Sequence, residues 1–118
     1  MLATVLATAS DRGERLRIRG TVMGTDCAPI RGAVLDIWHA DARGGYDLDR
    51  FRFRGRLAAD REGHWDLRTI TPGRYLDGRR YRPAHLHVKI AAPGYEPLTT
   101  QLYFTGDPYL AGDRMRRW

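Results

Sequence analysis

The sequence predicts an all-β protein, a Greek-key β-sandwich of about six to eight short strands with little or no helix. Glycine and proline, which number 13 and 6 among the 118 residues, interrupt the chain at short intervals, as they do where turns join short strands. Between these interruptions, apolar and polar side chains alternate with the period of a half-buried strand. The spacing of an amphipathic helix is absent, apart from a turn expected after Pro108.

The first half of the chain predicts two strands joined by a turn. Residues 15–22 alternate between arginine and apolar side chains, so this strand has one solvated face. Residues 25–32 form the expected turn around Pro29. The nearly continuous apolar run at 33–39 is typical of a central strand. Residues 41–49 are expected to form a glycine-containing loop.

The rest of the chain adds four alternating segments. Phenylalanine alternates with arginine at residues 50–54, and apolar residues alternate with polar ones at 64–68. Leucine, valine and isoleucine alternate with two histidines and a lysine at 85–90. A last alternating segment lies at 101–104. Each of these segments predicts one short strand.

Length and composition indicate one globular domain over residues 1–118. We expect an N-terminal arm at 1–13, a core at 14–106 that bears the functional residues, and a C-terminal tail at 107–118. Cys27 is the only cysteine, so no internal disulfide can form, which favours a reducing compartment such as the cytoplasm. No apolar run approaches the roughly 20 residues of a membrane-spanning helix, and no membrane partner is expected.

The chain is strongly basic, with a formal net charge of +6 and a pI near 10.1. Lys89 is the only lysine, so arginine supplies nearly all of the positive charge. These arginines are spread along the chain and no nucleic-acid-binding motif accompanies them, which argues against a nucleic-acid partner. A positive field would instead favour an anionic small substrate.

Two histidines form the sharpest local feature. His85 and His87 stand at positions i and i+2 of a predicted strand, so both side chains leave the same face, about 6.5 to 7 Å apart. Two imidazoles in this arrangement can bind one metal ion. The alternative is a pair of unrelated surface histidines.

Several residue types can complete such a site. One carboxylate would give a facial triad, and four aspartates are candidates: Asp47, Asp60, Asp66 and Asp77. Tyrosine is the other option, because a highly charged metal stabilises the phenolate form. Tyr46, after two glycines, and Tyr75, after a Pro-Gly-Arg turn, stand in loops. A half-buried structural role is expected for the remaining tyrosines: Tyr81, Tyr95, Tyr103 and Tyr109.

An ordered set of motifs in this chain resembles the intradiol ring-cleaving dioxygenases, the family of the catechol and protocatechuate dioxygenases. The motifs, in chain order, are Gly20-Thr21-Val22, Pro29, Gly32-Ala33, Ile37-Trp38, Gly45-Tyr46-Asp47, Thr69-Ile70-Thr71-Pro72-Gly73-Arg74-Tyr75, Arg82-Pro83-Ala84-His85-Leu86-His87, Thr100-Gln101-Leu102-Tyr103-Phe104 and Gly106-Asp107. They span about nine-tenths of the chain. The resemblance implies a β-sandwich, in agreement with the alternation.

The resemblance also implies a mononuclear non-haem Fe(III) site. Its ligands would be two tyrosinates, Tyr46 and Tyr75, and two histidines, His85 and His87. In the family, the tyrosine at the position of Tyr75 leaves the metal when substrate binds. That released phenolate can accept a proton from the catechol, so Tyr75 has a catalytic role as well.

Two further residues match catalytic positions of the family. Arg82 matches the arginine that flanks the catechol, where an always-charged guanidinium would stabilise negative charge on the ring. Gln101 matches a pocket glutamine near the iron. His39 stands where the family commonly carries glutamine, and we expect it to be a hydrogen-bonded structural residue rather than another ligand.

The expected function is therefore that of an Fe(III)-dependent intradiol dioxygenase, with a small catechol and O2 as its substrates. The alternative is a β-sandwich binding module whose metal site is vestigial or binds without turnover. The sequence lacks the N-terminal helical region of the catechol-cleaving branch, so we expect a homo-oligomer in which a neighbouring subunit covers exposed apolar surface. The arm with Leu2, Val5 and Leu6 and the tail that ends in Trp118 are candidates for this contact.

Overall fold

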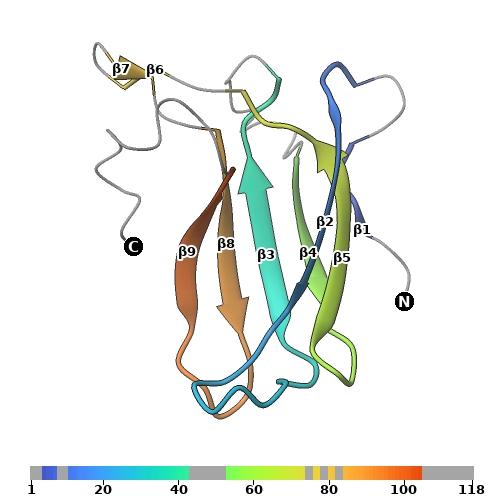
Figure 1. The fold of residues 1–118 in the computed structure, drawn as a ribbon, viewed down its shortest axis with the longest axis vertical. Helices are drawn as coiled ribbons and strands as arrows, with labels where there is room; N and C mark the ends of the chain where they lie inside the picture. Colours follow the sequence, from blue (N-terminus) through green and yellow to red (C-terminus); the bar gives the residue numbers. More distant parts are fainter. Residues whose placement is uncertain are drawn as a thin grey trace.

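A computed structural model describes residues 4–7, 11–42, 53–73, 76–77, 80–81 and 84–104. Within them are nine short strands, and no helix occurs there (Figure 1). The strands are β1 (Thr4–Val5), β2 (Arg15–Thr21), β3 (Val34–His39), β4 (Arg54–Ala58), β5 (His64–Ile70), β6 (Leu76–Asp77), β7 (Arg80–Tyr81), β8 (His85–Ala91) and β9 (Leu98–Tyr103). Consequently the described segments contain no helix that could cross a membrane.

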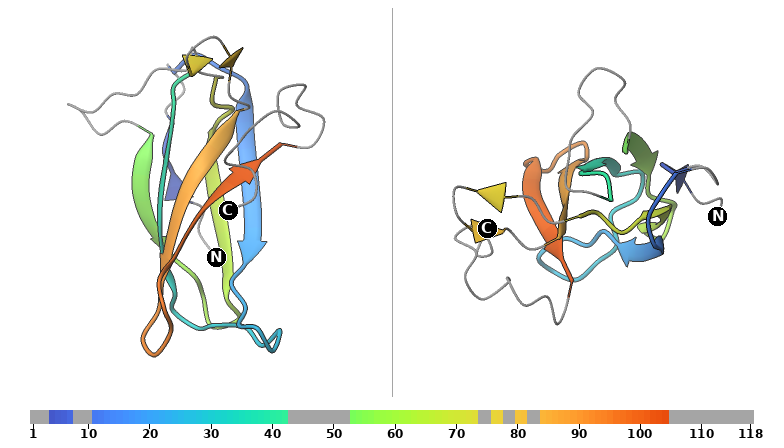
Figure 2. Two further views of the ribbon diagram at one scale, coloured as in Figure 1. Left: turned by 90° about the vertical axis from the view of Figure 1, so that its left-hand side faces the viewer. Right: turned by 90° about the horizontal axis from the view of Figure 1, so that it is seen from above.

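Seven of these strands form the two layers of a sandwich. One sheet has the order β1-β5-β2 and the other β4-β3-β8-β9, and the two lie face to face in Figures 1 and 2. Only the β1–β5 pair is parallel. The chain changes layer between β2 and β3 and again between β4 and β5, so both sheets are needed to complete the core. The predicted all-β sandwich is confirmed.

The core lies between the sheets, where the alternating apolar residues meet. Leu35 and Ile37 of β3, Leu67 of β5, and Leu86 and Val88 of β8 are almost fully buried. Burial of such a side chain contributes roughly 1.5 to 3 kcal/mol relative to leaving it exposed. The side chains at alternate positions therefore point away from this core, on the outer faces of the sheets.

Of the strand predicted at 50–54, residues 50–52 lie outside the described residues and only Arg54 is in a described strand. β4 begins only at Arg54, and Phe53 occupies a turn with a positive φ of 56°. The Phe53 side chain is buried with Ala7 and Ile70 in a small cluster separate from the main core. Its carbonyl accepts a hydrogen bond from the backbone N–H of His39. This packing takes Phe53 out of the ladder, a tertiary effect that alternation does not reveal.

The N-terminal arm is built into the first sheet. Thr4 and Val5 pair with Leu67 and Arg68 of β5, and Leu6 packs against the main core of its own chain. Val5, in contrast, is 62% exposed. Of the residues proposed to reach a neighbouring subunit, Val5 is on the surface and Leu6 is packed in the core, whereas Leu2 and Trp118 lie outside the described residues. The turn expected after Pro108 and the tail lie outside the described residues.

The end of the sandwich where β3 finishes and β8 starts positions the candidate site. The β6–β7 hairpin lies at this same end, the upper end in Figure 1 and in the left view of Figure 2. His39, the last residue of β3, pairs with Leu86, the second residue of β8.

Candidate functional site

His85 and His87 lie side by side on the outer face of the four-stranded sheet. Their ring centroids are 4.9 Å apart, and the ring planes are inclined by 74°. Leu86 and Val88, between and beyond them, point into the core and hold the strand in place. His85 is only 2% exposed, whereas His87 is half-buried. Two imidazoles so close together, from one rigid strand, suit a shared metal ion.

His87 is part of a continuous row of side chains across the sheet. In the register, Arg54 of β4 faces Trp38 of β3, Trp38 faces His87 of β8, and His87 faces Gln101 of β9. The Trp38 and His87 rings are stacked, with centroids 5.1 Å apart and planes only 3° from parallel. The Arg54 guanidinium lies over the indole, 5.2 Å from its centroid. We call these four residues the His87 row.

Gln101 is oriented by a neighbour two positions away on the same strand. The hydroxyl of Tyr103 donates to Oε1 of Gln101 at 2.7 Å, which directs the amide N–H2 end away from Tyr103. The Tyr103 ring also lies 6.0 Å from that of His85, its partner in the register. Tyr103 therefore has more than the structural role expected for it, because it lies next to two predicted site residues, His85 and Gln101.

Tyr46, Tyr75 and Arg82 lie outside the described residues. Their sequence neighbours, however, lead to the same end of the sandwich. Tyr75 directly precedes β6 and Arg82 directly follows β7, the hairpin seen at that end (Figure 1). The backbone N–H of Gly73, two residues before Tyr75, donates to the carbonyl of Asp41, five residues before Tyr46. The segments that lead to the two tyrosines are therefore joined.

Two of the four aspartates considered for a facial triad are engaged elsewhere in the fold. Asp66 lies in the other sheet, and Asp60 accepts backbone hydrogen bonds from Glu62 and His64 in a turn. Among the described residues, no group of three or more histidine, cysteine, aspartate or glutamate side chains gathers where a metal could bind. The side chains of Asp47 and Asp77 lie outside the described part of the chain, as do those of Tyr46 and Tyr75. An aspartate and the two tyrosines therefore both stay candidates to complete the His85–His87 pair.

His39 has the hydrogen-bonded structural role predicted for it. Its side chain points into the core, where Nδ1 donates to the carbonyl of Ala40 at 2.6 Å and Nε2 lies 2.7 Å from Oγ1 of Thr69. Burial lowers the pKa of His39 below its ordinary value, and the Ala40 hydrogen bond opposes this only in part. Nε2 of the neutral ring then accepts a hydrogen bond from the Thr69 hydroxyl, so both ring nitrogens are hydrogen-bonded within the fold.

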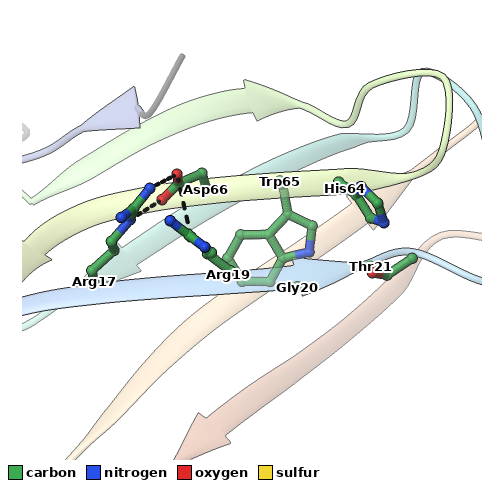
Figure 3. A pocket seen from close by; sticks show the side chains of 7 residues that line it. All are labelled: Arg17, Arg19, Gly20, Thr21, His64, Trp65 and Asp66. Carbon is green, nitrogen blue, oxygen red and sulfur yellow. Dashed lines mark hydrogen bonds and ion pairs between the residues drawn. The ribbon is translucent and has the colours of Figure 1, made fainter. Parts of the chain in front are cut away.

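A second candidate site lies on the opposite outer face, between β2 and β5. There a hollow of about 460 Å³ is lined by Arg17, Arg19, Gly20, Thr21, His64, Trp65 and Asp66 (Figure 3). Gly20 leaves room for the indole of Trp65, which a Cβ at that position would overlap. Figure 3 shows the two arginines turning toward the single carboxylate.

The positive charge of this hollow is partly offset within the chain. Arg17 donates to both carboxylate oxygens of Asp66, from Nε at 3.1 Å and from Nη2 at 2.6 Å, and Arg19 adds an ion pair at 3.7 Å. The hydrogen bond from Arg17 holds the pKa of Asp66 below its ordinary value. Neither predicted histidine lies near this face, and we assign it no catalytic role.

Comparison with known proteins identifies the family. A family model described as a dioxygenase matches residues 2–117. The chlorocatechol 1,2-dioxygenase of Rhodococcus opacus is 38% identical over 132 residues, which cover 94% of this chain and 51% of that enzyme. The chain belongs to the intradiol dioxygenase family.

Solved structures of family members share the fold. The dioxygenase domain of a dioxygenase carbohydrate-binding protein fusion from Streptomyces sp. SirexAA-E has a TM-score of 0.86 and 45% identity, covering 95% of this chain and 70% of that one. Hydroxyquinol 1,2-dioxygenase from Pseudomonas putida DLL-E4 has a TM-score of 0.85 and 32% identity, covering 96% and 46%. The chain spans about half the length of the curated relatives it matches, such as the Rhodococcus enzyme.

Three residues that lie around His85, His87 and Gln101 were not proposed from the sequence as site residues. Trp38 entered only as one motif residue, Arg54 only as a polar residue of a strand, and Tyr103 only as a structural tyrosine. Parity along a strand could have placed Tyr103 beside Gln101, since they are two residues apart. The partners of Trp38 depend on the register between strands far apart in sequence, for which the chain carries no local signal.

Proposed function

We propose that this protein is an Fe(III)-dependent intradiol dioxygenase that cleaves a small catechol between its two hydroxylated carbons. The observation that carries the proposal is the His85–His87 pair, in a chain that belongs to a family whose members include catechol, chlorocatechol and hydroxyquinol 1,2-dioxygenases. The overall reaction adds both atoms of O2 to the catechol and yields a muconate-type diacid. It balances without an external reductant.

In this proposal four side chains hold the metal: Tyr46, Tyr75, His85 and His87. When bound, Fe(III) supplies the positive charge that favours the dianion of the catechol and makes its ring reactive toward O2. Strand β8 presents both histidines from one rigid element, so their separation is fixed before the metal arrives. The two phenolates reduce the net charge of the centre.

The protein's own residues manage protons and charge around the substrate. Tyr75 would help to hold the metal as a phenolate, and its phenolic oxygen would accept a proton from a catechol hydroxyl. Arg82 stabilises the negative charge that builds on the ring, because its guanidinium stays protonated throughout. Gln101, held at Oε1 by Tyr103, offers its amide N–H2 as a fixed donor. Such preorganised donors need no rearrangement during the reaction.

Metal content and colour test the site, and oxygen uptake tests the activity. The purified protein should contain about one Fe(III) per chain and absorb visible light through phenolate-to-iron charge transfer. Tyr46→Phe and Tyr75→Phe should each alter that band. A colourless protein with stoichiometric zinc would contradict the ferric assignment. Coloured iron protein that consumes no O2 with catechol would instead favour the binding-module alternative.

A further inference from the structure

The His87 row contains a residue to which no role has yet been given, namely Trp38. Its indole is parallel to the His87 imidazole within 3°, at a centroid distance of 5.1 Å. Because β3 lies between β4 and β8, Arg54 approaches the indole from the side opposite His87. The indole is thus held between a cation and an imidazole, both of them its direct partners in the register.

Without a neighbouring ring, the imidazole of a histidine on a strand could rotate about χ2. The χ2 torsion of histidine has broad, roughly two-fold wells, so the plane of the ring is poorly fixed by the side chain alone. A parallel aromatic neighbour restricts that plane, since turning the ring would break the stack. A ring nitrogen binds a metal through a lone pair in the ring plane. The stack therefore restricts the directions from which His87 can bind.

The inclination between the two histidines makes this restriction decisive. The His85 and His87 planes meet at 74°, so only positions along the line where the planes cross lie in both of them. A metal bound by both rings must lie close to that line. Turning His87 would move the line, whereas His85 is already constrained by its burial and by the neighbouring Tyr103 ring.

Arg54 is itself held in place. Its Nη2 lies 3.2 Å from Oδ2 of Asp36, which stands two residues before Trp38 on the same outer face. The guanidinium is about half exposed, with 47% of its side chain accessible, so a cation–π contact here is of the weaker, solvent-exposed kind. Asp36 and Arg54 therefore support the indole, and the indole supports the imidazole.

We propose that Trp38 is a positioning residue that fixes the ring plane of His87 for metal binding, with Arg54 as its support. This inference rests on the proposed function, because it concerns the metal bound by the two histidines. In this proposal Trp38 is not itself a ligand, and it acts on the metal only through His87. Residues that orient metal ligands typically change metal affinity by about 10- to 100-fold when replaced.

The test uses four variants of the full chain. Trp38→Leu removes the stack, Trp38→Phe keeps an aromatic ring, and Arg54→Ala removes the cation. Val34→Ala is the matched control, because Val34 is exposed on the same outer face of β3 but lies two rows away from His87. In the metal-free protein, NMR should show ring-current shifts of the His87 ring protons in wild type, Trp38→Phe and Val34→Ala. These shifts should disappear in Trp38→Leu.

Iron binding is then measured by competition with a chelator. We expect Trp38→Leu to bind Fe(III) about 10- to 100-fold more weakly than wild type, with Trp38→Phe restoring most of the affinity. For Arg54→Ala a loss of about two- to fivefold is expected. If Trp38→Leu fails to fold, the Arg54→Ala result decides, since that change is mild. Unchanged iron affinity in Trp38→Leu, or in Arg54→Ala where Trp38→Leu does not fold, beside a wild type that binds iron, overturns this inference alone. A wild type that binds no iron overturns the proposed function and this inference with it.

Discussion

The two sheets of the sandwich both turn a polar face outward, but the two faces differ in how their polar groups are used. On the β2–β5 face, Arg17 and Arg19 converge on Asp66, so that one carboxylate engages two guanidinium groups (Figure 3). On the β3–β8–β9 face, His85, His87 and Gln101 lie among the aromatic rings of Trp38 and Tyr103. Imidazole and amide groups are side chains that bind metals and substrates, whereas the Asp66 carboxylate on the other face is already engaged by two arginines.

The hollow on the β2–β5 face is not the preferred site. The β2–β5 hollow is open and lined by charged residues, yet its arginines already share a carboxylate. The histidine face is preferred because it brings together side chains that can bind a metal, not because of the size of a cavity. Burial of His85 on that outer face is itself informative, because an outward-facing residue of a strand is ordinarily solvated.

The largest contrast is expected from removing one histidine from each face. His87→Ala should abolish stoichiometric iron binding and ring cleavage, because it removes a proposed ligand. It also removes the ring on which Trp38 stacks. His64→Ala, on the β2–β5 face, should leave iron content and turnover within about twofold of wild type, as expected of an exposed substitution. Iron analysis and oxygen uptake measure both. Equal losses in the two variants would remove the distinction between the faces.

Arginine-to-lysine changes give the next contrast. Arg82→Lys keeps the charge but loses the planar guanidinium, so turnover should fall by orders of magnitude while iron remains bound. The matched variant is Arg19→Lys on the β2–β5 face, where the side chain is largely exposed and turnover should not change measurably. The proposed role of Arg82 would be wrong if the two variants turned over equally.

A third variant should change the stability of the β2–β5 face without changing the chemistry. Gly20→Ala places a methyl group where the indole of Trp65 lies, and overpacking of this kind typically lowers the free energy of unfolding by about 1 to 3 kcal/mol. Thr21→Ala, on the exposed side of the same strand, should stay within about 0.5 kcal/mol. Denaturant unfolding measures both. Iron bound per folded chain should be the same in the two variants.

How much of this could be anticipated from sequence differs between residues. Period-two alternation suffices to place His85 and His87 on one face and Leu86 in the core, because parity is a local property of a strand. The His87 row could not be anticipated, since Trp38 and His87 become neighbours only through pairing between β3 and β8, nearly fifty residues apart. Phe53 was misplaced for a related reason, because its contacts with Ala7 and Ile70 are long-range.

The smallest expected effect concerns pH and the buried histidine beneath the site. The pKa of His39 is lowered in the fold, so the unfolded chain binds a proton more readily. Its stabilising contribution is therefore complete above the ordinary histidine pKa of about 6.5 and declines as the pH falls toward the lowered value. His39→Gln, which can still donate to Ala40 and accept from Thr69, should flatten the decline in unfolding free energy between about pH 7 and pH 5. A variant with the same pH slope as wild type would show that another group is responsible.

The central claim is that the histidine face binds Fe(III) and performs intradiol cleavage. The most direct measurement is mass spectrometry of the product formed from catechol under 18O2 by the iron-loaded protein, with His87→Ala as the blank. The account predicts a muconate-type diacid that carries oxygen from 18O2 in both new positions, absent with the blank. A semialdehyde from cleavage beside the hydroxyls, or no product from protein that holds stoichiometric Fe(III), would contradict it.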